Sequence, residues 1–201
     1  MCRRIAVAAL AFIAAHVTLA AGAPPAAGAA ARAGDFDRVM QLLIDQPHRR
    51  ARFVEHQFLS ILDRPLVSSG ELLFDAPNRL VKRTLEPRPQ TMTVVGDELS
   101  IDSGRKHRVL DLRDYPQIAP FVDSIRATLA GDRAELERHF EIEFDGSVDH
   151  WTLRLTPKDP VLARRISRIL IAGARGDLTE VDIRETDGDH SSMRIDGDGA
   201  P

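Results

Sequence analysis

Short turn signals divide residues 52–86 into three extended segments, and no other stretch limits the possible fold as strongly. The segments 52–62, 69–75 and 78–86 are separated by Asp63-Arg64-Pro65 and by Ala76-Pro77. Pro77 lacks a backbone donor and biases Ala76 towards extended geometry, which suits a corner between strands. Extended segments joined by such corners predict an antiparallel meander.

Further strand patterns follow along the chain. Gly96-Asp97 and Asp187-Gly188 are tight-turn signals that join neighbouring extended segments. The remaining predicted strands are residues 90–95, 98–102, 106–112, 140–144, 151–156, 166–172, 178–185 and 191–195. About eleven strands in one chain predict a mainly β fold (α+β), organised as an antiparallel sheet or barrel.

Helical periodicity interrupts this pattern. Asp35 is a candidate N-cap for a first amphipathic helix that ends before Gln46-Pro47, and Asp132 is a candidate cap for a short helix over 133–139. Between them, residues 117–129 predict a helical insertion. Its apolar face consists of Ile118, Phe121, Val122, Ile125 and Leu129.

The N-terminus has the pattern of a secretory signal. Arg3 and Arg4 precede the apolar segment 5–19, and small residues follow with an A-x-A pattern at 27–29. We therefore expect residues 1–29 to be a cleaved signal peptide, the folded domain to span residues 35–196, and residues 197–201 to form a loose tail. The alternative is an uncleaved anchor helix. The only cysteine, Cys2, lies in this leader, so the mature chain excludes disulfides and thiol catalysis.

No motif for catalysis or cofactor binding is present. The sequence has no Gly-x-Ser-x-Gly motif, no glycine-rich phosphate loop and no histidines at metal-ligand spacing. The formal net charge of −3 and the low aromatic content, 5%, give no support for a nucleic-acid partner. We expect neither an enzyme nor a metal or other cofactor site.

Basic residues gather in two of the predicted strands. They are Arg79, Lys82 and Arg83, and Arg105, Lys106 and Arg108. They would suit anionic head groups, or they form a solvated face paired with nearby carboxylates. The amphipathic helices leave a similar choice: they either fill one face of the sheet completely or cover an apolar cavity.

Several stretches, in this order, resemble one known family, the LolA-like carriers of outer-membrane lipoproteins, and particularly its divergent members. They are residues 53–57 (FVEHQ), 65–74 (PLVSSGELLF), 77–80 (PNRL), 95–99 (VGDEL), 151–158 (WTLRLTPK) and the hairpin that ends near Ile195. One departure is Ala76, which stands where carriers of this family have an arginine that hydrogen-bonds the lid.

The resemblance implies an unclosed antiparallel β-barrel whose helices form a lid over an apolar cavity for acyl chains, without catalytic residues or metal. It implies a monomeric periplasmic carrier of a lipoprotein or glycolipid, with an inner-membrane donor and an outer-membrane acceptor as partners. The alternative is a non-catalytic periplasmic adaptor that binds a protein partner. On this basis we expect a sheet-side wall of Val81, Leu85, Met92, Val94 and Ile101, and a lid of Phe121, Val122, Ile125 and Leu129.

Overall fold

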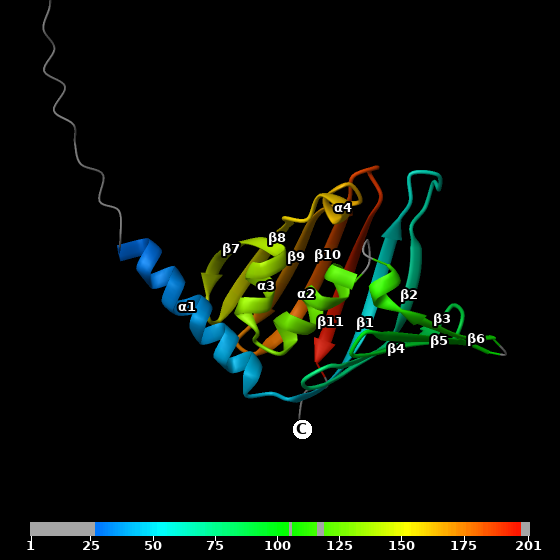
Figure 1. Cartoon of the computed structure of the whole chain (residues 1–201), viewed down its shortest axis with the longest axis horizontal. Helices are drawn as coiled ribbons and strands as arrows, with labels where there is room; N and C mark the ends of the chain where they lie inside the picture. Colours follow the sequence, from blue (N-terminus) through cyan, green and yellow to red (C-terminus); the bar gives the residue numbers. More distant parts are fainter. Residues whose placement is uncertain (1–26, 105, 116–118, 198–201) are drawn as a thin grey trace, which may run out of the picture.

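A single antiparallel sheet dominates the computed structural model, which describes residues 27–104, 106–115 and 119–197 (Figure 1). Within these residues eleven strands follow the order β6-β5-β4-β3-β2-β1-β11-β10-β9-β8-β7. Their bounds are β1 His48–Phe58, β2 Leu66–Asp75, β3 Arg79–Glu86, β4 Gln90–Val95, β5 Glu98–Ser103, β6 Lys106–Asp111, β7 Phe140–Ser147, β8 His150–Pro157, β9 Ile166–Ala174, β10 Asp177–Glu185 and β11 His190–Gly197. The predicted mainly β fold class is confirmed.

The first and last strands meet in the middle of the sheet. Phe53 of β1 lies opposite Ile195 of β11 on one side and opposite Gly70 of β2 on the other. All other neighbours are consecutive in the sequence, so the chain forms two meanders, β1–β6 and β7–β11, that share the β1–β11 junction.

Gly70 marks an irregularity in the β2–β3 pairing. The register shifts between Ser69 and Gly70, and a Cβ built on Gly70 would lie 1.9 Å from the carbonyl oxygen of Arg83. Only glycine permits this close approach of two backbones.

In the described part of the chain, four α-helices and a short 3-10 segment accompany the sheet: α1 Ala27–Ile44, η1 Leu112–Asp114, α2 Ala119–Leu129, α3 Arg133–His139 and α4 Pro160–Ala163. Figure 1 shows α2 and α3 lying over one face of the curved sheet, and α1 packs against β7 and α2. The helical insertion between β6 and β7 is thus where the periodicity predicted it.

The helices fill only part of this face. The larger core joins α1, α3 and the end of α2 to strands β7–β11 and to Phe74 of β2; its fully buried members include Leu43, Leu136, Trp151, Leu153 and Ile169. A smaller core of Val94, Leu99, Leu112 and Val122 joins the start of α2 to β4 and β5. The central strands between these two cores keep open space above them.

Two local predictions need correction. α1 begins at Ala27, so Asp35 lies inside the helix and is not its N-cap. β1 begins at His48, four residues earlier than expected. In addition, Pro160–Ala163 form the short helix α4, which the sequence analysis did not predict; Asp159 caps it by accepting hydrogen bonds from the backbone of Val161 and Leu162, and Pro160 occupies the first turn. Most of the expected signal peptide lies outside the described residues.

Candidate functional site

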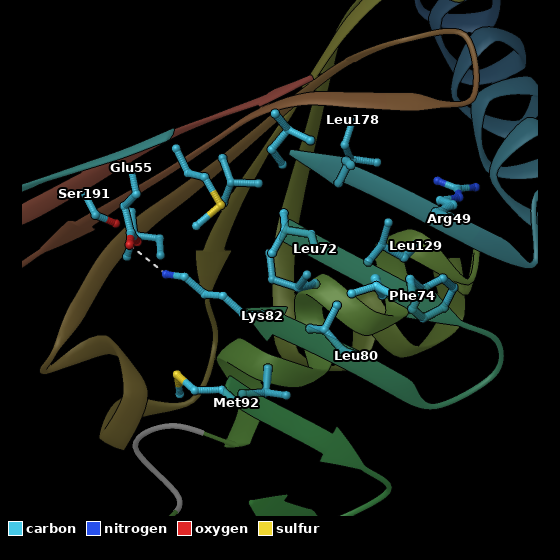
Figure 2. Close-up of a pocket in the computed structure, with 18 of the residues that line it drawn as sticks. Arg49, Glu55, Leu72, Phe74, Leu80, Lys82, Met92, Leu129, Leu178 and Ser191 are labelled. Carbon is cyan, nitrogen blue, oxygen red and sulfur yellow. Dashed lines mark hydrogen bonds and ion pairs between the residues drawn. The ribbon is translucent and has the colours of Figure 1, made fainter. Parts of the chain in front are cut away.

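A cavity of about 530 Å³ lies over the central strands of the sheet, beneath α2 (Figure 2). Its volume is in the range of about 300–1,000 Å³ that is typical of small-molecule sites. Strands β1–β5 contribute one side, β10 and β11 the other, and α2 covers part of the opening. Both meanders therefore supply walls to one shared space.

Apolar side chains form most of the cavity wall. From the first meander they are Leu72, Phe74, Leu80, Met92, Val94 and Leu99; from the second they are Leu178, Val181, Ile183, Met193 and Ile195. α2 adds Val122, Ile125 and Leu129. In Figure 2, Leu72, Leu80 and Leu129 point towards one another around this space. Such a surface accommodates apolar matter better than a polar substrate.

The structure brings together five of the nine residues expected in the site. Met92, Val94, Val122, Ile125 and Leu129 line the cavity. Ile101 lies opposite Met92 on β5 and packs on the smaller core beside the cavity. The side chain of Phe121 lies outside the described residues.

Val81 and Leu85 are not among the cavity-lining residues. The residues of β3 that do line it are Leu80 and Lys82. Because side chains alternate along a strand, Val81 belongs to the other face of the sheet. Leu85 is the extra residue of the bulge between Thr84 and Glu86. Leu80 and Lys82 were missed because periodicity gives alternation but not which set faces inward.

An ion pair interrupts the apolar wall. Lys82 Nζ lies 2.6 Å from Glu55 Oε2, and the two side chains are only 27% and 18% exposed. Ser68 Oγ donates to the same carboxylate oxygen at 3.1 Å, and the ammonium lies 5.0 Å from the centre of the Phe53 ring. Figure 2 shows the pair extending towards each other inside the cavity.

The other basic residues expected to form a cluster do not join Lys82. Arg79 pairs with Asp75 and Arg83 with Glu71, on exposed positions of the sheet. β6, which carries the second basic group, is separated from β3 by β4 and β5. The two basic groups therefore do not lie on neighbouring strands. Arg105 lies outside the described residues.

Arg49 lies near the end of α1. Its guanidinium donates to the carbonyl oxygens of Leu43 at 2.5 Å and of Gln46 at 3.0 Å. Burial lowers its pKa, and the charge of Asp177 acts in the opposite direction. Arg49 therefore closes the last turn of α1 and ties that helix to β1.

α2 is held on the sheet by a polar contact as well as by apolar packing. Arg126 Nη1 donates to the carbonyl oxygen of Gly96 in the β4–β5 turn at 2.7 Å, and Nη2 pairs with Asp123. Burial raises the pKa of Asp123, and the charge of Arg126 partly offsets this. Ala76, at the position of the family's lid-binding arginine, cannot supply such a contact, whereas Arg126 supplies one from the lid itself.

The described residues contain no group of three or more His, Cys, Asp or Glu side chains placed to hold a metal ion. Within the same part of the chain, no helix combines the length and the hydropathy that a membrane crossing needs.

Solved structures with a related fold have low sequence identity to this chain. A LolA superfamily protein from Nitrosomonas europaea is 11% identical, with a TM-score of 0.42 over 85% of this chain and 95% of that one. MucB of Pseudomonas aeruginosa in complex with MucA is 14% identical, with a TM-score of 0.45 over 85% and 58%. A putative outer membrane lipoprotein-sorting protein domain from Vibrio parahaemolyticus is 9% identical, with a TM-score of 0.44 over 85% and 94%.

No curated protein matches this chain. The family model described as outer membrane lipoprotein carrier protein LolA-like, in contrast, matches residues 27–200, which include every helix and strand of the fold. Members of this family are periplasmic carrier or binding proteins. The resemblance carried by the sequence motifs is confirmed, and the chain belongs to the LolA-like family of outer membrane lipoprotein carrier proteins.

Proposed function

We propose that this protein is a periplasmic carrier that binds acyl chains of a lipoprotein or another lipid in the cavity beneath α2. The observation that carries the proposal is the cavity of about 530 Å³, which is walled by aliphatic side chains from both meanders and covered by an amphipathic helix. Leu72, Leu80 and Met193 pack at the edge of the larger core and also line the cavity, so the central face presents apolar groups that a ligand can cover.

The energy of such binding is adequate for a carrier. Each buried methylene contributes about 0.8 kcal/mol, so a chain with about twelve of them gains roughly 10 kcal/mol. The association itself costs roughly 4–15 kcal/mol. At the lower end of that cost a net gain of about 6 kcal/mol remains, which is a moderate affinity in the micromolar range, and opening of the lid suffices for release.

The proposed wall follows the geometry of the cavity. Leu72, Leu80, Met92 and Val94 form the sheet side, and Leu80 takes the place of the expected Val81. Val122, Ile125 and Leu129 form the lid. A charge placed among these side chains would face the ligand without a partner, which is strongly unfavourable.

Displacement of an environment-sensitive apolar dye by a saturated acyl ligand tests this function. We expect the wild-type chain to bind the dye while folded and to release it on addition of the ligand. Ile125→Asp should abolish uptake, and Ile61→Asp, at an 86% exposed position in the β1–β2 turn, should leave it unchanged. Uptake that persists in folded Ile125→Asp, or a folded wild type that never binds the dye, would contradict the proposal.

A second candidate function is that of an adaptor for a protein partner. It is favoured by the apolar side chains that the β1–β2 turn exposes, which are Phe58, Ile61, Leu62, Leu66 and Val67. Exposed groups of this kind mark interaction sites. If this function is the main one, Ile61→Asp should abolish partner capture and Ile125→Asp should not.

A further inference from the structure

The Glu55–Lys82 pair reaches across the strand that separates its two members. Glu55 belongs to β1 and Lys82 to β3, and β2 runs between them. On the face towards the cavity, β2 presents Ser68, Gly70 and Leu72 in turn. Gly70 has no side chain, so the lysine can cross above it and over the Phe53 ring to reach the carboxylate. The bulge at Leu85 in β3, next to Gly70, and this glycine thus make the contact possible.

The pair keeps unused hydrogen-bonding capacity on its cavity side. Among the described residues, Glu55 Oε2 accepts from both Lys82 and Ser68, whereas no contact is recorded for Oε1. An ammonium group has three donors, and Lys82 Nζ uses one of them on Glu55. The pair therefore offers both a donor and an acceptor while carrying no net charge.

This charge balance discriminates between ligands. A fatty-acid carboxylate that approaches Lys82 must share the ammonium with Glu55, and two carboxylates at one site repel each other. Displacing Glu55 instead would leave a partly buried carboxylate without its cation, which is costly. The carbonyl oxygen of an ester or amide accepts a hydrogen bond from Lys82 without either penalty.

The other buried cation of the cavity does not provide an alternative carboxylate site. Arg49 lies six residues before Glu55 on β1, and Figure 2 shows it on the far side of the aliphatic cluster from Glu55. Its guanidinium is already engaged with the main-chain carbonyls of Leu43 and Gln46. Its remaining nitrogen, Nη1, is buried and has no hydrogen-bond partner among the described residues.

We propose that the Glu55–Lys82 pair makes the cavity selective for acyl chains with a neutral ester or amide head group over free fatty acids. This inference rests on the proposed function of acyl-chain binding. The substrate class is then acyl chains with a neutral head group, and Glu55 and Lys82 on the cavity wall determine this selectivity.

Displacement titrations with palmitate and with a monopalmitoyl glycerol test the selectivity, because both ligands carry the same chain. We expect the wild-type protein to bind the neutral ester about tenfold more tightly, as one hydrogen bond to a charged group is worth about that ratio. Glu55→Gln leaves Lys82 with its charge unpaired and should raise the affinity for palmitate about tenfold, which removes or reverses the preference.

Three further variants test whether the ligand preference arises from the Glu55–Lys82 pair. Lys82→Met leaves Glu55 alone in the wall and should weaken palmitate binding further. In the double variant Glu55→Gln with Lys82→Met, neither charge of the pair remains, so palmitate and the neutral ester should bind with similar affinity. Glu71→Gln breaks a neighbouring Glu–Arg pair, that of Glu71 with Arg83, outside the cavity, and should leave the preference as in the wild type.

The possible results separate this inference from the proposed function. Binding of both ligands with equal affinity, unchanged in Glu55→Gln and Lys82→Met, would overturn the selectivity and leave acyl-chain binding intact. Failure of the folded wild type to bind either ligand would overturn the proposed function, and the selectivity with it.

Discussion

Replacing Arg126 with methionine should loosen α2 from the sheet. The guanidinium is 19% exposed, donates to the carbonyl oxygen of Gly96 at 2.7 Å and pairs with Asp123 on its own helix. Methionine keeps the length and the apolar stem of the side chain, so the substitution removes the polar contacts and little of the packing. Apolar side chains then remain as the principal contacts of α2 with the cavity and the smaller core.

The magnitude follows from the kind of bond that is lost. A hydrogen bond from a charged donor contributes about 1.5–3 kcal/mol, which corresponds to a roughly ten- to hundredfold change in the equilibrium between closed and open lid. The pKa of Asp123, already raised by burial, should rise further when the opposing charge of Arg126 is absent.

Hydrogen exchange of the backbone amides of residues 122–129 measures the opening of α2 directly. Protection in Arg126→Met should fall by that factor, and a bound apolar dye should dissociate correspondingly faster. Arg138→Met is the matched control, because Arg138 also pairs with a carboxylate three residues earlier, Glu135, but is 66% exposed. Equal protection of α2 in the wild type and in Arg126→Met would refute the role of this contact.

Three further predictions concern the framework around the cavity. Gly173→Ala should destabilise the fold by about 1–3 kcal/mol, since the new Cβ would lie 2.2 Å from the Trp151 ring; a wild-type melting temperature would contradict this. Asp159→Ala should cost about 1 kcal/mol through loss of the α4 cap, measurable by urea unfolding. Hydrogen bonds from Arg113 lower the pKa of Asp111 to about 2, so the contribution of this carboxylate to the stability of the fold is lost as the pH falls from about 4 to about 2. The free energy of unfolding of Asp111→Asn should therefore depend less on pH in this range than that of the wild type.

Turn chemistry and periodicity predicted the fold well. Pro77, Gly96 and Gly188 each mark a corner between neighbouring strands, and the corresponding hairpins are present. The helical spacing from Val122 to Leu129 predicted α2, because only one face of that segment is apolar. These signals are local in sequence, so a single chain suffices to detect them.

The inward face of β3 and the start of α1 were harder to predict. Leu80 and Val81 are both aliphatic, and an alternating strand gives no sign of which of them faces the cavity. Asp35 is a good cap residue, but the small residues before it also favour a helix, so α1 continues to Ala27. The contact between Glu55 and Lys82 depends on a bulge at Gly70, and a bulge has no reliable sequence signal.

The meeting of β1 and β11 at the centre of the sheet has a consequence for the order of folding. Each meander forms from contacts between neighbours in sequence, whereas pairing Phe53 with Ile195 requires closure of a loop that contains most of the chain. That pairing is therefore expected late, after the last strand has emerged during synthesis. Because Leu72 and Leu80 belong to one meander and Val181 and Met193 to the other, the cavity exists only once this junction has closed. Cargo therefore binds only the completed fold and, by mass action, stabilises the junction that joins its halves.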